Sequence, residues 1–221
     1  MAKPLAKYID HTLLKPDATQ DQIDEVLAQA KQYGFASVCI NPYWVVRAAA
    51  SLRDTDVNVC TVIGFPNGYC TTAVKCFEAA TAVADGAQEI DMVIHLGWVK
   101  EGRYDAVQAE IEAVRRVCRG QTLKVIIETC LLTEAEKVRL CQVVTDAGVD
   151  FIKTSTGFAG GGATLEDVAL LADHVGPGVQ VKASGGIAGL QDAAAMLAAG
   201  AARLGTSRVV GEVKRKEEGR I

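Results

Sequence analysis

Three charged residues lie inside short apolar segments of the sequence, where a charge is costly unless it is paired or used. Asp91 lies within EIDMV, Lys153 within FIKTS and Lys182 within VQVKA. A free lysine has a pKa of about 10.4 and is almost fully protonated at neutral pH. A neighbouring ammonium group and an apolar wall both disfavour the charged form, so paired lysines favour a free amine. Because a free amine attacks carbonyl groups to form an imine, the pair indicates covalent catalysis. The structural alternative is that the lysines snorkel outward or form a buried salt-bridge cluster with Asp91.

Eight apolar, β-branched segments alternate with eight segments of helical periodicity. The predicted strands are Tyr8–Leu13, Ser37–Asn41, Asn58–Gly64, Glu89–His95, Leu123–Thr129, Phe151–Ser155, Val179–Ala183 and Arg203–Thr206. The predicted helices are Asp21–Tyr33, Trp44–Leu52, Thr71–Asp85, Tyr104–Cys118, Glu134–Ala147, Leu165–His174, Leu190–Ala199 and a short one from Ser207. This α/β alternation predicts a (β/α)8 TIM barrel. The second choice, an open doubly wound sheet, lacks its dinucleotide fingerprint after the first strand.

The barrel fold would place the two lysines side by side. Active sites of such barrels form at the C-terminal ends of the strands. Lys153 and Lys182 lie on the sixth and seventh predicted strands, which are neighbours, so both side chains are expected at the barrel mouth.

Glycine-rich segments follow the last three predicted strands. They contain Gly157 and Gly160–Gly162, then Ser184-Gly185-Gly186, then Gly205-Thr206-Ser207. The loops after strands seven and eight, with a short helix, are the usual phosphate site of these barrels. Glycine allows backbone N–H groups to approach an anion closely. The joint placement predicts a phosphate site, although glycines in single loops also serve simply as tight turns.

Composition narrows the classes of protein. The 221 residues carry a net charge of -4 and are 49% hydrophobic, which favours one folded domain, 1–221, with a charged tail from about residue 212. No basic surface or apolar span indicates nucleic acid or a membrane as a partner. The seven cysteines form no C-x-x-C pair and the first residues lack a signal peptide, so we expect reduced thiols and a cytoplasmic location. No spacing of metal ligands is present, so neither a metal nor a cofactor is expected.

These segments resemble the deoxyribose-phosphate aldolase family, which is a class of Schiff-base aldolases. The resemblance runs from Ile9 to about Ser207. Its most specific parts are FIKTSTGF at 151–158 and VKASGG at 181–186, and IDHTLL, VCINP, GFP and EIDMV support it.

The resemblance implies reversible cleavage of 2-deoxy-D-ribose 5-phosphate to D-glyceraldehyde 3-phosphate and acetaldehyde, without a metal. Lys153 matches the Schiff-base lysine, Lys182 the second lysine that lowers the pKa of the first, and Asp91 the acid/base carboxylate. Asp10 matches a polar contact of the second lysine. The residues that match the phosphate region are Gly157, Gly185, Gly186, Thr206 and Ser207.

Other features of the site remain open at this point. Cys39 lies near a strand end and is a candidate for the pocket wall, with a small core residue as the alternative, and Glu128 is a candidate supporting carboxylate. Some family members end in a tyrosine that assists proton transfer, but no tyrosine follows Tyr104 here. The partners expected are a small phosphorylated sugar, a short aldehyde and further copies of the chain, as a dimer or tetramer. An isomerase or epimerase that uses Asp91 and a lysine only for proton transfer, and a non-catalytic phosphate-binding barrel, are the competing functions.

Overall fold

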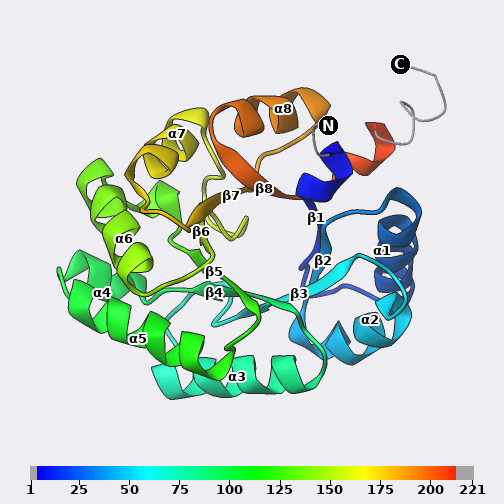
Figure 1. The fold of residues 1–221 in the computed structure, drawn as a ribbon, viewed down its shortest axis with the longest axis horizontal. Helices are drawn as coiled ribbons and strands as arrows, with labels where there is room; N and C mark the ends of the chain where they lie inside the picture. The colour runs from blue at the N-terminus through cyan, green and yellow to red at the C-terminus, as the bar shows by residue number, and fades with distance from the viewer. Residues whose placement is uncertain (1–3, 213–221) are drawn as a thin grey trace.

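The strands form a closed barrel in the computed structural model, which describes residues 4–212 (Figure 1). Each strand is parallel to its neighbours, and β8 pairs with β1 to close the ring. The strands are β1 Ile9–Leu13, β2 Ser37–Ile40, β3 Asn58–Ile63, β4 Glu89–Val93, β5 Thr122–Ile126, β6 Phe151–Lys153, β7 Gln180–Ser184 and β8 Ala201–Thr206. The predicted (β/α)8 TIM barrel is therefore confirmed.

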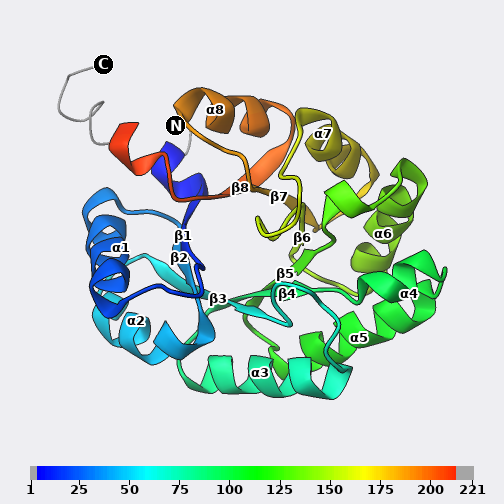
Figure 2. The ribbon, with the colours of Figure 1, turned by 180° about the vertical axis from the view of Figure 1, so that it is seen from behind.

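Helices surround the barrel, as the views from both ends show (Figures 1 and 2). The α-helices are α1 Gln20–Tyr33, α2 Val45–Leu52, α3 Thr72–Ala84, α4 Leu96–Lys100, α5 Tyr104–Val117, α6 Glu134–Asp146, α7 Leu165–His174 and α8 Leu190–Ala198. The 3-10 helices are η1 Leu5–Tyr8, η2 Pro42–Trp44 and η3 Thr129–Leu131. One apolar cluster fills the space between the two layers and includes Ile23, Ile111 and Leu171, all fully buried.

The ends of several helices follow directly from the sequence. Thr133 and Glu136 form a reciprocal capping box at the start of α6, as predicted, and Thr19 forms another with Gln22 at the start of α1. Gly34 ends α1 in the left-handed conformation, at φ 61°, where a side chain would be strained. These signals fix where the chain turns back toward the next strand.

The structure differs from the predicted elements in several places. Strand β5 ends at Ile126 rather than Thr129, and β8 begins at Ala201 rather than Arg203. The one-turn helix α4 was not predicted, because five residues are too few to show helical periodicity. Strand β6 ends at Lys153 rather than Ser155, although the Thr154 N–H still donates to the Lys182 carbonyl at 3.0 Å. The helix predicted from Ser207 begins three residues later, and the backbone is helical at 210–212, where the described residues end. The charged tail, predicted from about residue 212, lies outside the residues that the structure describes.

A membrane-crossing helix is not found between residues 4 and 212, since no helix there is both long and apolar enough.

Candidate active site

Asp91 lies at the centre of the barrel interior and contacts three lysines. Its Oδ2 atom accepts hydrogen bonds from Lys153 Nζ at 2.7 Å and from Lys182 Nζ at 2.6 Å. Its Oδ1 atom accepts one from Lys124 Nζ at 2.8 Å. The structure thus brings together the three residues that the sequence singled out, and it adds a third lysine.

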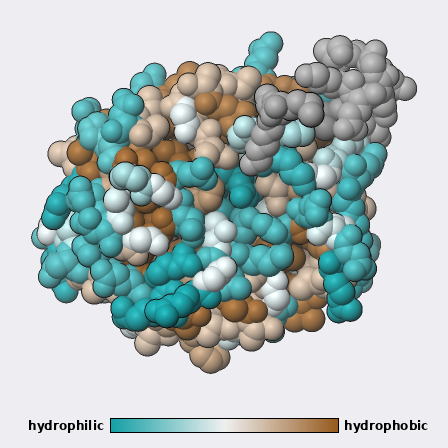
Figure 3. All heavy atoms as spheres, in the orientation of Figure 1, coloured by the Kyte–Doolittle hydropathy of each residue, from teal (hydrophilic) through white to brown (hydrophobic). Residues whose placement is uncertain are grey.

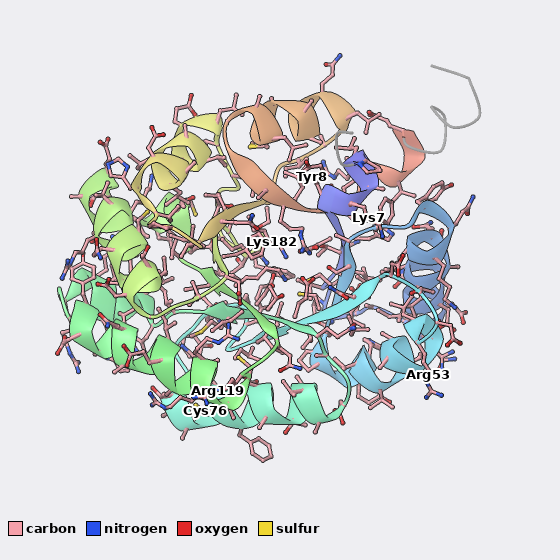
Figure 4. All side chains as sticks on the ribbon, viewed as in Figure 1. Lys7, Tyr8, Arg53, Cys76, Arg119 and Lys182 are labelled. Atoms are coloured by element: carbon pink, nitrogen blue, oxygen red, sulfur yellow. The ribbon has the colours of Figure 1, made fainter. Side chains whose placement is uncertain are left out.

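The pairing of the strands explains this arrangement. Lys153 on β6 is the register partner of Lys182 on β7, and Asp91 on β4 is the partner of Lys124 on β5. Side chains alternate between the two faces of a strand, so register partners point to the same side of the sheet. Figure 4 shows Lys182 inside the ring of strands.

Asp10 on β1 contacts Lys182, as the sequence resemblance implied. The distance from Asp10 Oδ2 to Lys182 Nζ is 2.5 Å. The other carboxylate oxygen, Oδ1, accepts hydrogen bonds from Ser37 Oγ at 2.7 Å and from Arg203 at 2.6 Å. Lys182 is therefore held between two carboxylates.

Sequence reasoning missed Lys124, Glu89 and Arg203. Lys124 Nζ lies 2.6 Å from Glu89 Oε2, and Arg203 contacts the same carboxylate at 3.0 Å. We call the joined set of seven residues the charged network: Asp10, Glu89, Asp91, Lys124, Lys153, Lys182 and Arg203. Lys124 lies in the apolar segment TLKVI, so the rule that identified the other two lysines applies to it as well.

Charges within the network set the protonation of its members. Burial alone would raise the pKa of Asp91, but the Lys124, Lys153 and Lys182 ammonium groups lower it well below its ordinary value. Burial alone would lower the pKa of Lys182, yet Asp10 and Asp91 outweigh it and raise that pKa above its usual range. The Asp91–Lys182 contact is therefore an ion pair at neutral pH.

A cavity of about 340 Å³ opens at the C-terminal ends of the strands, above Lys153. Every residue that the sequence assigned to the phosphate region lines it, whereas Asp10, Asp91 and Lys182 do not and are joined to it through Lys153. The lining residues that matter here are Gly157, Gly185, Gly186, Thr206 and Ser207, together with Lys15, Lys153 and Arg208. The last three are cationic, and no carboxylate lines the cavity among residues 4–212. The site therefore suits an anionic ligand.

The loops beside the cavity are held tightly to one another. A side chain at Gly162 would come within 2.5 Å of the Gly185 backbone, so the loops after β6 and β7 pack with no room for one. Glu128, two residues after β5, accepts hydrogen bonds from both the N–H and the hydroxyl of Thr156. Glu128 has a φ of 54°, which is uncommon for a residue other than glycine. The expected supporting role of this carboxylate agrees with these contacts.

Cys39 lies below the cavity wall rather than in it. It is fully buried beside Cys60 and Asp91, which matches the alternative of a small core residue. The ligand atoms of the two thiols and the Asp91 carboxylate lie within 4.8 Å of one another, so these three groups are possible metal ligands. Asp91 is already neutralised by three ammonium groups, and a cation would have to displace them.

Comparison with known proteins shows the family of this chain. Residues 5–209 match the model of the DeoC/LacD family aldolases. The chain belongs to this family. It is therefore an aldolase, which is a lyase, as the sequence predicted, and the isomerase and non-catalytic alternatives are set aside.

Named relatives of this aldolase cover nearly its whole length. It is 58% identical over 202 residues to deoxyribose-phosphate aldolase of Staphylococcus carnosus, covering 91% of this chain and 92% of the relative. It is 57% identical over 217 residues to the enzyme of the same name from a Geobacillus strain, covering 98% and 97%. The solved tetrameric deoxyribose-phosphate aldolase of Aeropyrum pernix superposes with a TM-score of 0.88 at 36% identity, covering 95% of this chain and 91% of that one.

Proposed function

We propose that this aldolase cleaves 2-deoxy-D-ribose 5-phosphate reversibly to D-glyceraldehyde 3-phosphate and acetaldehyde, through a Schiff base on Lys153. One observation carries the proposal. Among the seven residues of the charged network, Lys153 is the member that lines the cavity, and it does so beside Asp91 and Lys182. An amine that reaches the substrate can attack its carbonyl group, whereas an amine beneath the cavity cannot.

The number of carboxylate partners also favours Lys153 as the nucleophile. Lys153 contacts Asp91 alone, Lys182 contacts two carboxylates, and Lys124 contacts three. Each carboxylate partner stabilises an ammonium group, and Lys153 has the fewest such partners of the three lysines. The network has four cationic and three anionic members, and a neutral Lys153 would balance its charge.

The proposed reaction proceeds through an imine. The Lys153 amine adds to the aldehyde carbon of the open-chain sugar, and loss of water gives a protonated imine. The C2–C3 bond then breaks as the C3 hydroxyl loses its proton. This step releases D-glyceraldehyde 3-phosphate, and the electrons of the broken bond form an enamine on Lys153. Protonation and hydrolysis of the enamine release acetaldehyde. Asp91 contacts both lysine nitrogens through one oxygen, so we assign to Asp91 and Lys182 the relay of the protons.

The same cavity would bind the phosphate. Lys15 and Arg208 line it and supply positive charge, and the glycine loops supply backbone groups near the ligand. Gly185 and Gly186 both have φ of 81°, a left-handed conformation that suits such a loop.

The test of this proposal is a trapped covalent adduct. The protein is treated with acetaldehyde and borohydride, which reduces an imine to a stable amine, and the modified peptide is identified by mass spectrometry. The expected result is one adduct, on Lys153. An adduct on Lys182 would reverse the assignment of the two lysines, and an adduct on neither would rule out the Schiff base.

We also propose that the chain forms a homo-oligomer, in a reducing, cytoplasmic environment. Five large apolar side chains are exposed on η2, α2 and α3 and just before α3: Tyr43, Val46, Tyr69, Val74 and Phe77. We call this set the apolar patch. Such a patch is typical of a protein–protein interface, and the Aeropyrum pernix relative is described as a tetramer.

All seven cysteines lie in the described part of the chain and are free, which fits a reducing compartment.

A further inference from the structure

Two cysteines face each other inside the barrel, directly beneath the candidate active site. Cys39 on β2 is the register partner of Cys60 on β3. Their Sγ atoms lie 3.7 Å apart, with the Cys60 thiol donating toward Cys39. Both residues are fully buried. The function proposed above uses neither of them.

Both thiols contact the carboxylate at the centre of the charged network. Cys60 Sγ lies 3.2 Å from Asp91 Oδ1 and 3.2 Å from Lys124 Nζ. Cys39 Sγ lies 4.0 Å from Asp91 Oδ2, the oxygen that binds Lys153 and Lys182. The position of either sulfur atom therefore affects the surroundings of Asp91.

The two thiols differ in acidity. The hydrogen bond from Cys60, together with the Lys182 and Lys153 ammonium groups, lowers the pKa of Cys39 despite its burial. Burial raises the pKa of Cys60, and the neighbouring Cys39 and Asp91 raise it further. Cys39 is thus the more acidic thiol of the pair, and the thiolate is the reactive form in thiol oxidation. The other remains a thiol at its side.

The geometry permits a bond between the two sulfur atoms. Neighbouring strands lie about 4.7–4.9 Å apart, within the 4.4–6.8 Å that separates the Cα atoms of a disulfide. The sulfur atoms need to close from 3.7 Å to a bond length of about 2.05 Å. Leu14 packs against this pair and also lines the cavity. One layer of side chains therefore separates the thiols from a space that a small oxidant can enter.

We infer that Cys39 and Cys60 form an oxidisable thiol pair, and that a disulfide between them reversibly switches the enzyme off. The oxidant is a peroxide, with hydrogen peroxide as the simplest example. The Cys39 thiolate attacks one peroxide oxygen, giving a sulfenic acid and hydroxide. Cys60 then attacks the Cys39 sulfur and displaces the second oxygen as water. The pair loses two electrons and two protons, peroxide is reduced to two waters, and an external dithiol reverses the change.

Disulfide formation would disturb the proton relay. The disulfide removes the Cys60 S–H group, whose sulfur lies 3.2 Å from Asp91 Oδ1, and draws that sulfur away from Lys124. The hydrogen bonds between Asp91 and the three lysines then change in length and strength. The loss of turnover rests on the function proposed above, but the formation of the disulfide does not. We expect activity to fall by about a hundredfold, because general acid–base help is typically worth 10²–10⁴-fold.

A metal ion is the other ligand that two thiols and a carboxylate suggest. Lys124, Lys153 and Lys182 all point their ammonium groups at Asp91, so a divalent cation would meet three positive charges within contact distance of one ligand. A disulfide is neutral and needs no such displacement. The observations therefore favour oxidation over metal binding at this pair.

The experiment follows the bond and the activity separately. The reduced protein is treated with hydrogen peroxide in the presence of EDTA, and activity is measured before and after addition of a dithiol. Peptides are mapped without reduction. We expect a linked peptide pair containing Cys39 and Cys60, a loss of activity of about a hundredfold, and recovery with dithiol. Cys39→Ala lacks the attacking thiolate, so its activity after peroxide treatment should equal its activity before treatment.

Cys130→Ser is the matched control, because Cys130 is exposed and lies outside the pair. This variant should lose activity in peroxide as the unmodified protein does. Absence of the linked peptide in an inactivated sample, or a Cys39→Ala variant that is inactivated reversibly like its parent, would overturn the inference. If the disulfide forms but the reduced protein has no aldolase activity, the proposed function fails instead. Mapping of the unmodified protein needs no variant, so a variant that does not fold leaves the test intact.

Discussion

At the scale of single residues, Lys153 on β6 and Lys182 on β7 have different surroundings, so their replacement should have different effects. Lys153→Leu removes the proposed nucleophile, so turnover and borohydride trapping should both vanish at every pH. Lys182→Leu leaves the nucleophile in place but removes the ammonium between Asp10 and Asp91. Activity of this second variant should fall by about 10²–10⁴-fold, the usual worth of acid–base help.

Trapping at alkaline pH distinguishes the two variants. Without Lys182, Asp91 has one fewer cation to satisfy and holds the Lys153 ammonium more firmly. Raising the pH should then restore the adduct on Lys153 in Lys182→Leu and restore nothing in Lys153→Leu. Peptide mapping of the reduced adduct at neutral and alkaline pH makes the measurement. Equal recovery in both variants would contradict the assignment.

His11 makes the stability of the barrel depend on pH. Burial lowers the pKa of its imidazole, and its Nδ1 atom has no hydrogen-bond partner among the described residues. The folded state therefore favours neutral His11, whereas the unfolded chain takes up a proton near its ordinary pKa of about 6.5. His11 contributes stability above that pH, and the contribution is lost as the pH falls through the lower pKa of the folded state.

Denaturant unfolding at several pH values tests this effect. The free energy of unfolding should decrease below about pH 6.5, and His11→Gln should show a shallower decrease because its amide does not titrate there. The same slope in both proteins would assign the pH dependence to the carboxylates of the fold instead.

The sequence identified the site residues through a simple rule, that a charge inside an apolar strand needs a use. The rule found Asp91, Lys153 and Lys182, and it applies equally to Lys124, which was overlooked. Arg203 was harder to recognise, because it was taken as the start of its strand, whereas β8 begins at Ala201. Its role depends on Asp10 and Glu89, which are distant in sequence and meet it only in the closed barrel.

At the scale of elements, a buried ion pair joins two helices outside the active site. Lys75 of α3 and Glu110 of α5 are both fully buried, with 2.8 Å between Lys75 Nζ and Glu110 Oε2. The same Glu110 oxygen accepts from the His95 N–H, which precedes α4. The pair therefore connects three consecutive helices.

Breaking this ion pair should destabilise the fold strongly. Lys75→Met would leave the Glu110 charge buried without its cation, at a cost of about 3–5 kcal/mol in the free energy of unfolding. Combining it with Glu110→Gln should recover part of the loss, because the amide oxygen still accepts from His95 without a charge. Urea unfolding of both variants measures the difference. If the free energy of unfolding of Lys75→Met lies within about 1 kcal/mol of the parent value, water or structural relaxation compensates the Glu110 charge.

The predicted elements agree with the structure where periodicity and caps coincide, and differ where neither is present. α7 was predicted at the same bounds that it has, because Thr164 caps it and its apolar positions recur at helical spacing. The short helix α4 depends on His95, whose side chain accepts from the Trp98 N–H, and histidine is not a usual capping signal. Sequence patterns gave no reason to place a helix there.

At the scale of the whole molecule, the exposed apolar patch and the cavity lie on different parts of the chain. Figure 3, a space-filling view coloured by hydropathy, shows hydrophobic residues along its lower edge. In Figure 1, which has the same orientation, α3 lies at this edge. Phe77 on α3 is 73% exposed, and Tyr43 beside it on η2 is 83% exposed. Neither residue lines the cavity. Association through this patch would therefore bury the aromatic side chains without covering the site.

A charge at Phe77 of the patch should dissociate the proposed oligomer. Burial of one phenylalanine contributes about 1.5–3 kcal/mol, and Phe77→Glu forfeits this in each copy and also buries a carboxylate. Sedimentation analysis should show a shift of the variant toward the monomer. Leu165→Glu is the matched control, because Leu165 is an exposed apolar residue on α7 and should leave the mass unchanged. Since the charged network and the cavity are built from one chain, the Phe77→Glu monomer should still form the borohydride adduct on Lys153. An unchanged mass for Phe77→Glu would exclude the patch as the interface, and loss of the adduct in a folded monomer would mean that a second copy supports the site.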